Sequence, residues 1–115
     1  MGKIEEFQRE RDRLNALVLS RANLEIKRFF SLDSQVYRGG SIPVKYKELL
    51  GLVASLVLRC DDCVTYHIIR CHREGISREE FNEAMAIALV VGGSITIPHL
   101  RRAYDAWEEL QRTSP

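Results

Sequence analysis

The sequence has little of what breaks helices or builds strands. Its 115 residues include only 3 prolines and 7 glycines, and most of the glycines stand at plausible joints between segments. The signals that mark strands are weak along the whole chain. These shortages favour an all-α fold.

A long apolar run and a charge excess are also lacking, and each absence excludes a class of protein. The longest apolar run, residues 84–91, is far shorter than the roughly 20 residues that cross a bilayer. Acidic and basic residues are interspersed, with a formal net charge of +1, whereas nucleic-acid and membrane-surface proteins need a basic face. We therefore expect no nucleic acid and no membrane among the partners.

The beginning of the chain lacks a targeting signal. Residues 1–6 have no apolar core of the kind found in a signal peptide. Met1-Gly2 opens a myristoylation pattern, but Glu6 stands where serine or threonine is required. On this ground we expect a cytoplasmic protein.

Cysteine is scarce as well, at 3 residues. An odd number of cysteines without an export signal is a poor basis for a structural disulfide framework. In a reducing compartment, clustered cysteines instead serve metal binding or redox chemistry. Their spacing has to decide between the two.

Helical periodicity is what the chain does contain. Glycines mark several helix ends, and Ser77 with Glu80 forms a capping box at the start of another helix. The predicted helices cover Lys3–Leu19, about Asn23–Val36, Pro43 to about Leu58, about Cys60–Glu74, residues 77–91, and a last helix that carries Leu100 to Leu110. No repeat or long linker divides them. We predict one domain over residues 1–115, a helical bundle of about six helices.

Two of the predicted helices, residues 43–58 and 77–91, are apolar over more than half of their circumference. A chain of this size buries only part of its surface by itself. Some of this apolar area is therefore expected to meet other subunits, which predicts a homo-oligomer.

Cys60, Cys63, His67 and Cys71 are spaced i, i+3, i+7 and i+11, so they line one face of a helix. For Cys71 alone, simple core packing is the favoured interpretation, because free cysteine behaves as a small hydrophobic residue. For Cys60 and Cys63 the core-packing interpretation is much less favoured, since their charged neighbours suggest a helix start near solvent.

A metal site is a second interpretation of the same residues. Structural zinc needs four ligands around a tetrahedron, commonly from two separate elements, and a second element is absent here. One straight helix cannot wrap Cys60, Cys63, His67 and Cys71 around one ion. Glu48 or a neighbouring subunit would have to complete the site, so we predict no bound metal or other cofactor.

A redox dithiol fits the spacing best. Two thiols at i and i+3 in a first helical turn can close a disulfide, and the positive end of the helix dipole favours the Cys63 thiolate. His67, one turn further on, can take or relay the thiol proton. Asp61 and Asp62 help to cap the helix but disfavour a neighbouring anion.

An upstream carboxylate sharpens this interpretation. Glu48, Cys60, Cys63 and His67 spell E-x11-C-x2-C-x3-H. This composite pattern resembles the active-site motif of alkylhydroperoxidase D-like proteins, within the carboxymuconolactone decarboxylase family. The resemblance extends over residues 41–110 and includes the apolar helix before the cysteines and the alanine-rich helix after them.

The resemblance implies a thiol-dependent peroxidase or disulfide oxidoreductase that assembles as a trimer or hexamer. Cys63 would be the attacking thiolate, and Cys60 would donate a proton and then resolve the sulfenic acid as a disulfide. Glu48 and His67 would form the proton relay. A peroxide would be the substrate, and a lipoyl-like or thioredoxin-like dithiol the reductant.

Glu48 has a simpler interpretation beside this one. A straight helix would hold Glu48 and Cys60 roughly 18 Å apart, so Glu48 can take part only if the chain folds back between them. Without the resemblance, a solvated carboxylate beside Lys45 and Lys47 is the expected state. His99, which follows Pro98, is expected to be a packed or interface histidine.

The chain departs from the family pattern at Asp62, where the best-studied type of member has histidine. A negative charge there disfavours the Cys63 thiolate and predicts weaker peroxidase activity. Two alternatives stay open: a non-enzymatic oligomeric metal-binding module using Cys63 and His67, and an enzyme of this fold acting on a small carbon acid through Glu48 and His67.

Overall fold

The structure, a computed structural model, describes residues 2–113, which form two compact units. One unit extends to Arg38, and the other begins at Gly39. Within the described residues there are six α-helices and one 3-10 helix, and there is no strand. The predicted all-α fold of about six helices is confirmed.

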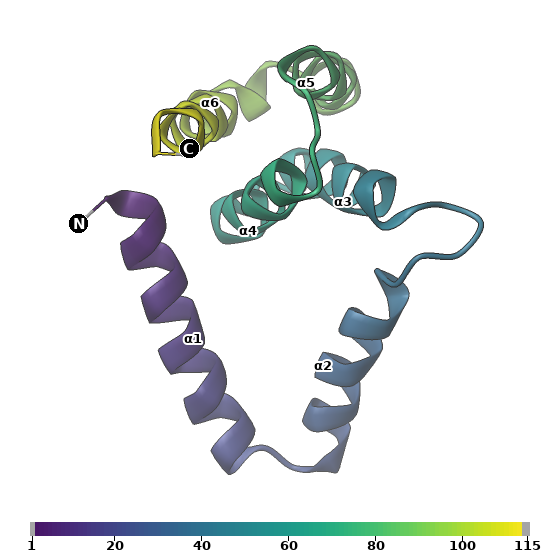
Figure 1. Cartoon of the computed structure of the whole chain (residues 1–115), viewed down its shortest axis with the longest axis vertical. Coiled ribbons are helices and arrows are strands. Elements are labelled where there is room, and N and C mark those ends of the chain that lie inside the picture. The colour runs from purple at the N-terminus through teal and green to yellow at the C-terminus, as the bar shows by residue number, and fades with distance from the viewer. Residues whose placement is uncertain (1, 114–115) are drawn as a thin grey trace. The chain divides into compact units, whose positions relative to one another are not determined.

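The first unit is a pair of helices, α1 (Lys3–Arg21) and α2 (Leu24–Val36), and the chain reverses direction between them (Figure 1). The Asn23 side chain caps α2 by accepting a hydrogen bond from the Ile26 N–H at 3.1 Å. Large apolar side chains of both helices are exposed in the single chain: Leu14, Leu17, Val18, Leu19, Leu24, Ile26, Phe29, Leu32 and Val36.

The second unit contains α3 (Val44–Val57), α4 (Asp61–Arg73), α5 (Arg78–Gly92), the 3-10 helix η1 (Ser94–Thr96) and α6 (Ile97–Thr113). Helix α3 packs against α4 and α5, and α4 also packs against α6. Their shared core consists of Leu52, Leu56, Val64, Ile68, Cys71, Ile76, Phe81, Ala84, Met85, Ala88, Ala103 and Trp107.

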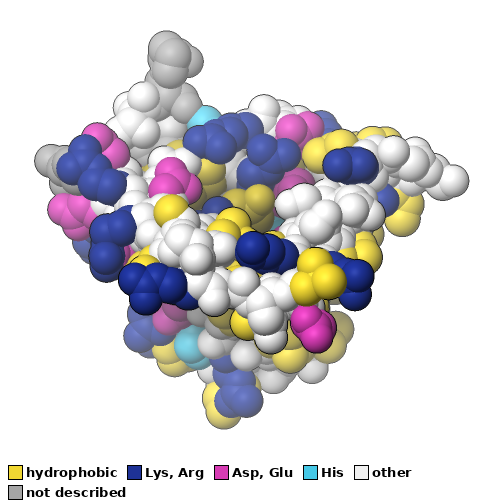
Figure 2. Space-filling model, turned by 90° about the horizontal axis from the view of Figure 1, so that it is seen from below, with side chains coloured by type: hydrophobic (Ala, Val, Ile, Leu, Met, Phe, Trp, Pro, Cys, Tyr) yellow, Lys and Arg dark blue, Asp and Glu magenta, His cyan; other side chains and the backbone are white. Residues whose placement is uncertain are grey.

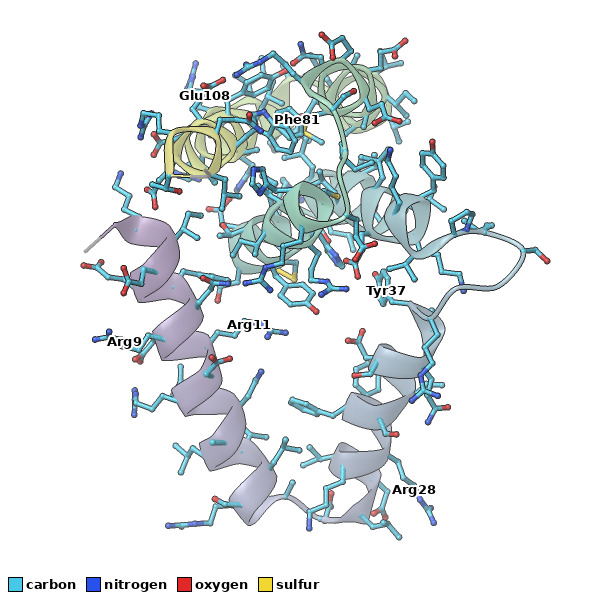
Figure 3. All side chains as sticks on the ribbon, in the orientation of Figure 1. Arg9, Arg11, Arg28, Tyr37, Phe81 and Glu108 are labelled. Atoms are coloured by element: carbon cyan, nitrogen blue, oxygen red, sulfur yellow. A yellow bond between two sulfur atoms is a disulfide. The ribbon has the colours of Figure 1, made fainter. Side chains whose placement is uncertain are left out.

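Aromatic stacking joins α5 to α6 in this core. The rings of Phe81 and Trp107 lie almost parallel with centroids 4.4 Å apart, and Phe81 points toward α6 (Figure 3). The predicted capping box starts α5, because the Ser77 hydroxyl accepts from the Glu80 N–H and the Glu80 carboxylate accepts from the Ser77 N–H. Local signals and core burial therefore agree on where α5 begins.

The turn between α3 and α4 positions the cysteines. Arg59 adopts a left-handed conformation, with φ of 60°, at the position after a helix where glycine is usual. Its N–H donates to the Leu56 carbonyl at 2.9 Å, and the Cys60 N–H donates to the Ser55 carbonyl at 3.1 Å. This paired pattern ends α3 and folds α4 back along it, which is the reversal that Glu48 needs to approach the cysteines.

The surface of the described residues is mixed in character. On the face drawn in Figure 2, basic side chains lie among acidic and hydrophobic ones. Apolar side chains of the two most apolar helices remain uncovered in the single chain: Leu50 on α3, and Ile87, Val90 and Val91 on α5. Between residues 2 and 113, no helix is both long and apolar enough to cross a membrane.

Candidate redox site

The first turn of α4 carries the two cysteines of the motif. Cys60 is the N-cap residue, and its Sγ accepts a hydrogen bond from the Cys63 N–H at 3.2 Å. The two residues form a disulfide, with Cα atoms 5.3 Å apart. Cys63 is exposed and Cys60 is half-buried. The pair therefore lies where a solvent-borne oxidant or reductant can reach it.

Glu48 on α3 forms a buried pair with His67, which lies one helical turn after Cys63 on α4. Nδ1 of His67 lies 2.9 Å from Oε1 of Glu48, and the two residues are 8% and 2% exposed. The solvated state expected for Glu48 without the resemblance is therefore wrong, because the reversal at Arg59 folds α4 over it. A carboxylate on Nδ1 fixes the orientation of the imidazole.

Arg70 completes the environment of Glu48. Its Nε lies 3.5 Å from Oε2 of Glu48, and its Nη2 lies 3.7 Å from the carboxylate of Glu74. A buried carboxylate is costly unless it is paired and hydrogen-bonded. His67 and Arg70 together supply this compensation for the buried Glu48 side chain.

His67 and Cys63 lie on the same face of α4, since they are four residues apart in one helix. The arrangement therefore runs from a buried carboxylate on α3, through a buried histidine, to an exposed sulfur one helical turn away. Chemically, this order suits the transfer of a proton between the sulfur and the imidazole, directly or through one water.

Cys71 follows the same helix face into the core. It is a free cysteine with no exposed surface. Burial, with a smaller contribution from the nearby negative charge of Glu48, raises the pKa of the Cys71 thiol to about 12. This thiol stays protonated at neutral pH, in agreement with the core-packing interpretation.

The described residues offer little to a metal ion. Between residues 2 and 113 no group of three or more histidine, cysteine, aspartate or glutamate side chains is placed to hold one. A metal site built on Cys63 and His67 would need further ligands from outside this set.

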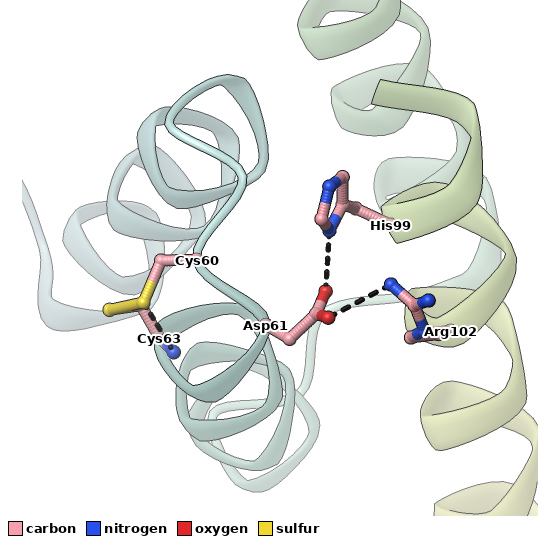
Figure 4. A network of polar contacts seen from close by, with 5 residues as sticks. All are labelled: Cys60, Asp61, Cys63, His99 and Arg102. Carbon is pink, nitrogen blue, oxygen red and sulfur yellow. Dashed lines mark hydrogen bonds and ion pairs between the residues drawn. A yellow bond between two sulfur atoms is a disulfide. The ribbon is translucent and has the colours of Figure 1, made fainter. Parts of the chain in front are cut away.

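A second polar cluster at the α4 N-terminus was not predicted from the sequence. Asp61 bonds to His99 and Arg102, both on α6 (Figure 4). Asp61 was expected to help cap α4, but the N-cap acceptor is the Cys60 sulfur. His99, expected to be a packed or interface histidine, is partly buried and hydrogen-bonded to Asp61, and the separation of 38 residues leaves no local signal of this contact.

The model of the carboxymuconolactone decarboxylase family matches residues 26–106. The chain belongs to this family. The matched segment of this carboxymuconolactone decarboxylase family protein contains both the Glu48–His67 pair and the two cysteines, as well as the cluster around Asp61.

Solved structures agree with that assignment. Two crystal structures of the Thermotoga maritima protein TM1620 match the chain at 62% identity, with TM-scores of 0.93 and 0.90. They cover 94% and 93% of this chain, and the chain covers 95% and 91% of theirs. TM1620 is described as a carboxymuconolactone decarboxylase family protein with a suggested part in an antioxidative response.

More distant relatives support the fold or a part of the sequence. A carboxymuconolactone decarboxylase family protein of Legionella pneumophila, lpg0406, is 22% identical with a TM-score of 0.84, over 93% of this chain and 96% of its own. An uncharacterised protein of Cupriavidus necator is 37% identical over 54 residues, which span 47% of this chain and about half of that protein, 48%.

Proposed function

We propose that this carboxymuconolactone decarboxylase family protein is a thiol-dependent peroxidase that cycles Cys60 and Cys63 between dithiol and disulfide. The observation that carries the proposal is the exposed cysteine pair on the first turn of α4, with the buried Glu48–His67 pair one turn below it. The suggested antioxidative role of TM1620 points in the same direction.

In the first half of the proposed reaction, the Cys63 thiolate attacks one peroxide oxygen. The O–O bond breaks, an alcohol or water leaves after it gains a proton, and Cys63 becomes a sulfenic acid. The Cys60 thiol then attacks the Cys63 sulfur, which forms the disulfide and releases water. The peroxide gains two electrons, and the dithiol loses two.

In the other half of the cycle, an external dithiol reduces the Cys60–Cys63 disulfide by exchange. A lipoyl-like or thioredoxin-like dithiol supplies the two electrons and leaves as a disulfide. In the first half of the cycle, before Cys63 attacks the peroxide, His67 takes the proton of the Cys63 thiol, and Glu48 stabilises the imidazolium that results. No cofactor is needed for these steps.

We also place this activity in a homo-oligomer, a trimer or hexamer. The uncovered apolar side chains of α3 and α5 motivate this assembly, since they resemble surfaces that meet a partner. A second subunit would enclose the exposed Cys63 and supply walls for a substrate pocket.

Serine variants of the two cysteines test the proposal with the full-length protein, a peroxide and a dithiol. Cys63→Ser should abolish peroxide consumption, because a serine hydroxyl is far less ionised at neutral pH. Cys60→Ser should allow the first oxidation and leave a sulfenic acid that dimedone labels. Cys71→Ser, a matched control for the loss of one thiol, should retain turnover. Peroxide consumption that survives Cys63→Ser would overturn the proposal.

Asp62 and His67 give a graded test of the same mechanism. Asp62→His removes a negative charge beside Cys63 and should speed Cys63 alkylation, whereas His67→Ala should slow it. A loss of one to two pKa units of thiol activation corresponds to about 1.4–2.8 kcal/mol. A Cys63 that titrates as an ordinary thiol and ignores both changes would exclude an activated thiolate.

The buried Glu48–His67 pair also favours a second candidate function, proton transfer on a small carbon acid. The carboxylate and imidazole would then act as base and acid without the cysteines. Activity toward such a substrate that persists in the Cys60→Ser, Cys63→Ser double variant would favour this candidate over the peroxidase.

A further inference from the structure

Asp61 ties the first turn of α4 to α6 on the side of the helix away from the dithiol (Figure 4). Nδ1 of His99 lies 2.7 Å from Oδ1 of Asp61, and Nη1 of Arg102 donates to Oδ2 at 2.9 Å. Both carboxylate oxygens are therefore engaged by side chains that lie outside the cysteine motif.

The position of Asp61 gives this contact a chemical consequence. Asp61 is the first residue of α4, between the N-cap Cys60 and Cys63 in the same turn. An unpaired carboxylate there opposes the thiolate, because like charges disfavour each other and because it offsets the positive end of the helix dipole. The guanidinium of Arg102 brings a compensating positive charge to that carboxylate.

Other charged groups near the same turn also contribute to the electrostatic environment of the two sulfur atoms. Arg59 in the α3–α4 turn and Asp62 on α4 are both exposed and opposite in sign. Glu48 lies buried on α3 with His67 as its partner. Asp61 is bonded to a cation of α6, so its effect on the sulfur depends on that helix.

We infer that His99 and Arg102 are positioning residues of the dithiol reaction, which act through Asp61 to hold the first turn of α4 and to offset its negative charge. This inference deepens the proposed function and rests on it. Neither side chain needs to touch the peroxide or the sulfur atoms.

The experiment measures the rate of Cys63 alkylation against pH with iodoacetamide, a neutral reagent that surface charge does not steer. It uses the full-length protein carrying Cys60→Ser, so that Cys63 is the accessible thiol and Cys71 stays buried. Arg102→Gln should move the alkylation profile to higher pH and slow the reaction at pH 7 about threefold, equivalent to about half a pKa unit. Arg102→Lys should restore most of the rate.

Two controls separate a specific effect from a general one. Arg101→Gln removes the same charge from the neighbouring residue of α6, which is not a partner of Asp61, and should leave the profile unchanged. Asp61→Asn should speed alkylation and abolish the effect of Arg102→Gln, because no carboxylate remains to be offset. His99→Ala should slow alkylation, and His99→Asn, which keeps a donor for Asp61, should recover it.

Equal effects of Arg101→Gln and Arg102→Gln, or an undiminished effect of Arg102→Gln in the Asp61→Asn background, would overturn the inference. So would an unchanged pH profile in variants that only lose thermal stability. Peroxide consumption is measured separately, with Cys60 restored. If the alkylation profile shifts as expected but no peroxide is consumed, the proposed peroxidase function fails while the role of Arg102 stands. If peroxide is consumed but Arg102→Gln leaves the alkylation profile unchanged, the role of Arg102 fails while the peroxidase function stands.

Discussion

The Glu48→Gln variant perturbs the buried pair at the centre of the site while keeping the shape of the side chain. In the native protein the Glu48 carboxylate is 2% exposed, hydrogen-bonded to His67 at 2.9 Å and ion-paired with Arg70 at 3.5 Å. Glutamine removes the negative charge but still offers an oxygen to accept a hydrogen bond. Both partners would then face a neutral amide.

The expected cost follows from the burial of the two partners. Hydrogen bonds to charged groups contribute about 1.5–3 kcal/mol, and removal of one partner from a fully buried ion pair costs about 3–5 kcal/mol. The Arg70 side chain is 31% exposed, so water replaces part of its lost interaction. We expect Glu48→Gln to lower the free energy of unfolding by about 2–3 kcal/mol, or the Tm by about 8–12 °C for a chain of this size.

Glu74→Gln is the matched control, because Glu74 also pairs with Arg70 but at 3.7 Å and with 33% of its side chain exposed. A half-buried surface pair of this kind, between residues four apart on a helix, contributes at most about 0.5 kcal/mol. Denaturant unfolding, followed by the fluorescence of the single, buried Trp107, measures both variants over a range of protein concentrations. Cys63 alkylation at neutral pH should also slow in Glu48→Gln.

Equal stability of the Glu48→Gln and Glu74→Gln variants would refute this reasoning. It would mean that the buried Glu48 carboxylate gains no more from its two partners than the half-buried Glu74 carboxylate gains from one. Wild-type Cys63 reactivity in Glu48→Gln would separately exclude Glu48 from the proton relay.

Three further predictions concern other parts of the structure. In a Cys60→Ser, Cys63→Ser background, the Cys71 thiol should make the free energy of unfolding fall with rising pH between the ordinary thiol pKa of about 8.5 and the folded pKa of about 12, because only the unfolded state releases the Cys71 proton in this range. The fall should be about 1.4 kcal/mol per pH unit steeper than in a derivative that also carries Cys71→Ala. Urea midpoints of the two proteins that run parallel over this range would contradict the prediction. Arg59→Gly should stabilise the protein by about 1 kcal/mol by relieving the left-handed backbone at φ of 60°, and Arg59→Ala, which keeps that strain, should not. Light scattering at low micromolar concentration should report a trimer or hexamer, and a stable monomer of 13.2 kDa would exclude the assembly.

The fold was predictable because its signals are local. Helical periodicity gave the six helices, and the Ser77–Glu80 capping box located the start of α5. The left-handed turn at Arg59 had no such signal, since the residue usual in that conformation is glycine. The division into two units at residue 38 was likewise not predicted, and the single-domain interpretation remains a prediction.

Spacing alone predicted the candidate site only where its residues share one helix, and Glu48 was added through the resemblance of the composite motif. Cys60, Cys63 and His67 follow from their spacing on α4, whereas the burial of Glu48 depends on a reversal between two helices. The sequence neighbours of Glu48, Lys45 and Lys47, indicate a solvated carboxylate, but tertiary packing overrides this local signal. The bond from Asp61 to His99 crosses 38 residues, so no spacing rule could have found it.

The buried Cys71 gives this protein an internal reporter of its own opening. Its sulfur has no exposed surface and lies among side chains of the core that α3, α4, α5 and α6 share. A labelling reagent can therefore meet that thiol only in molecules in which this core has opened. In a variant without the other two cysteines, the slow labelling rate under native conditions, compared with the rate for the unfolded chain, would give the free energy of that opening without denaturant. The same measurement with ligand or partner present would show which of them holds the four helices together.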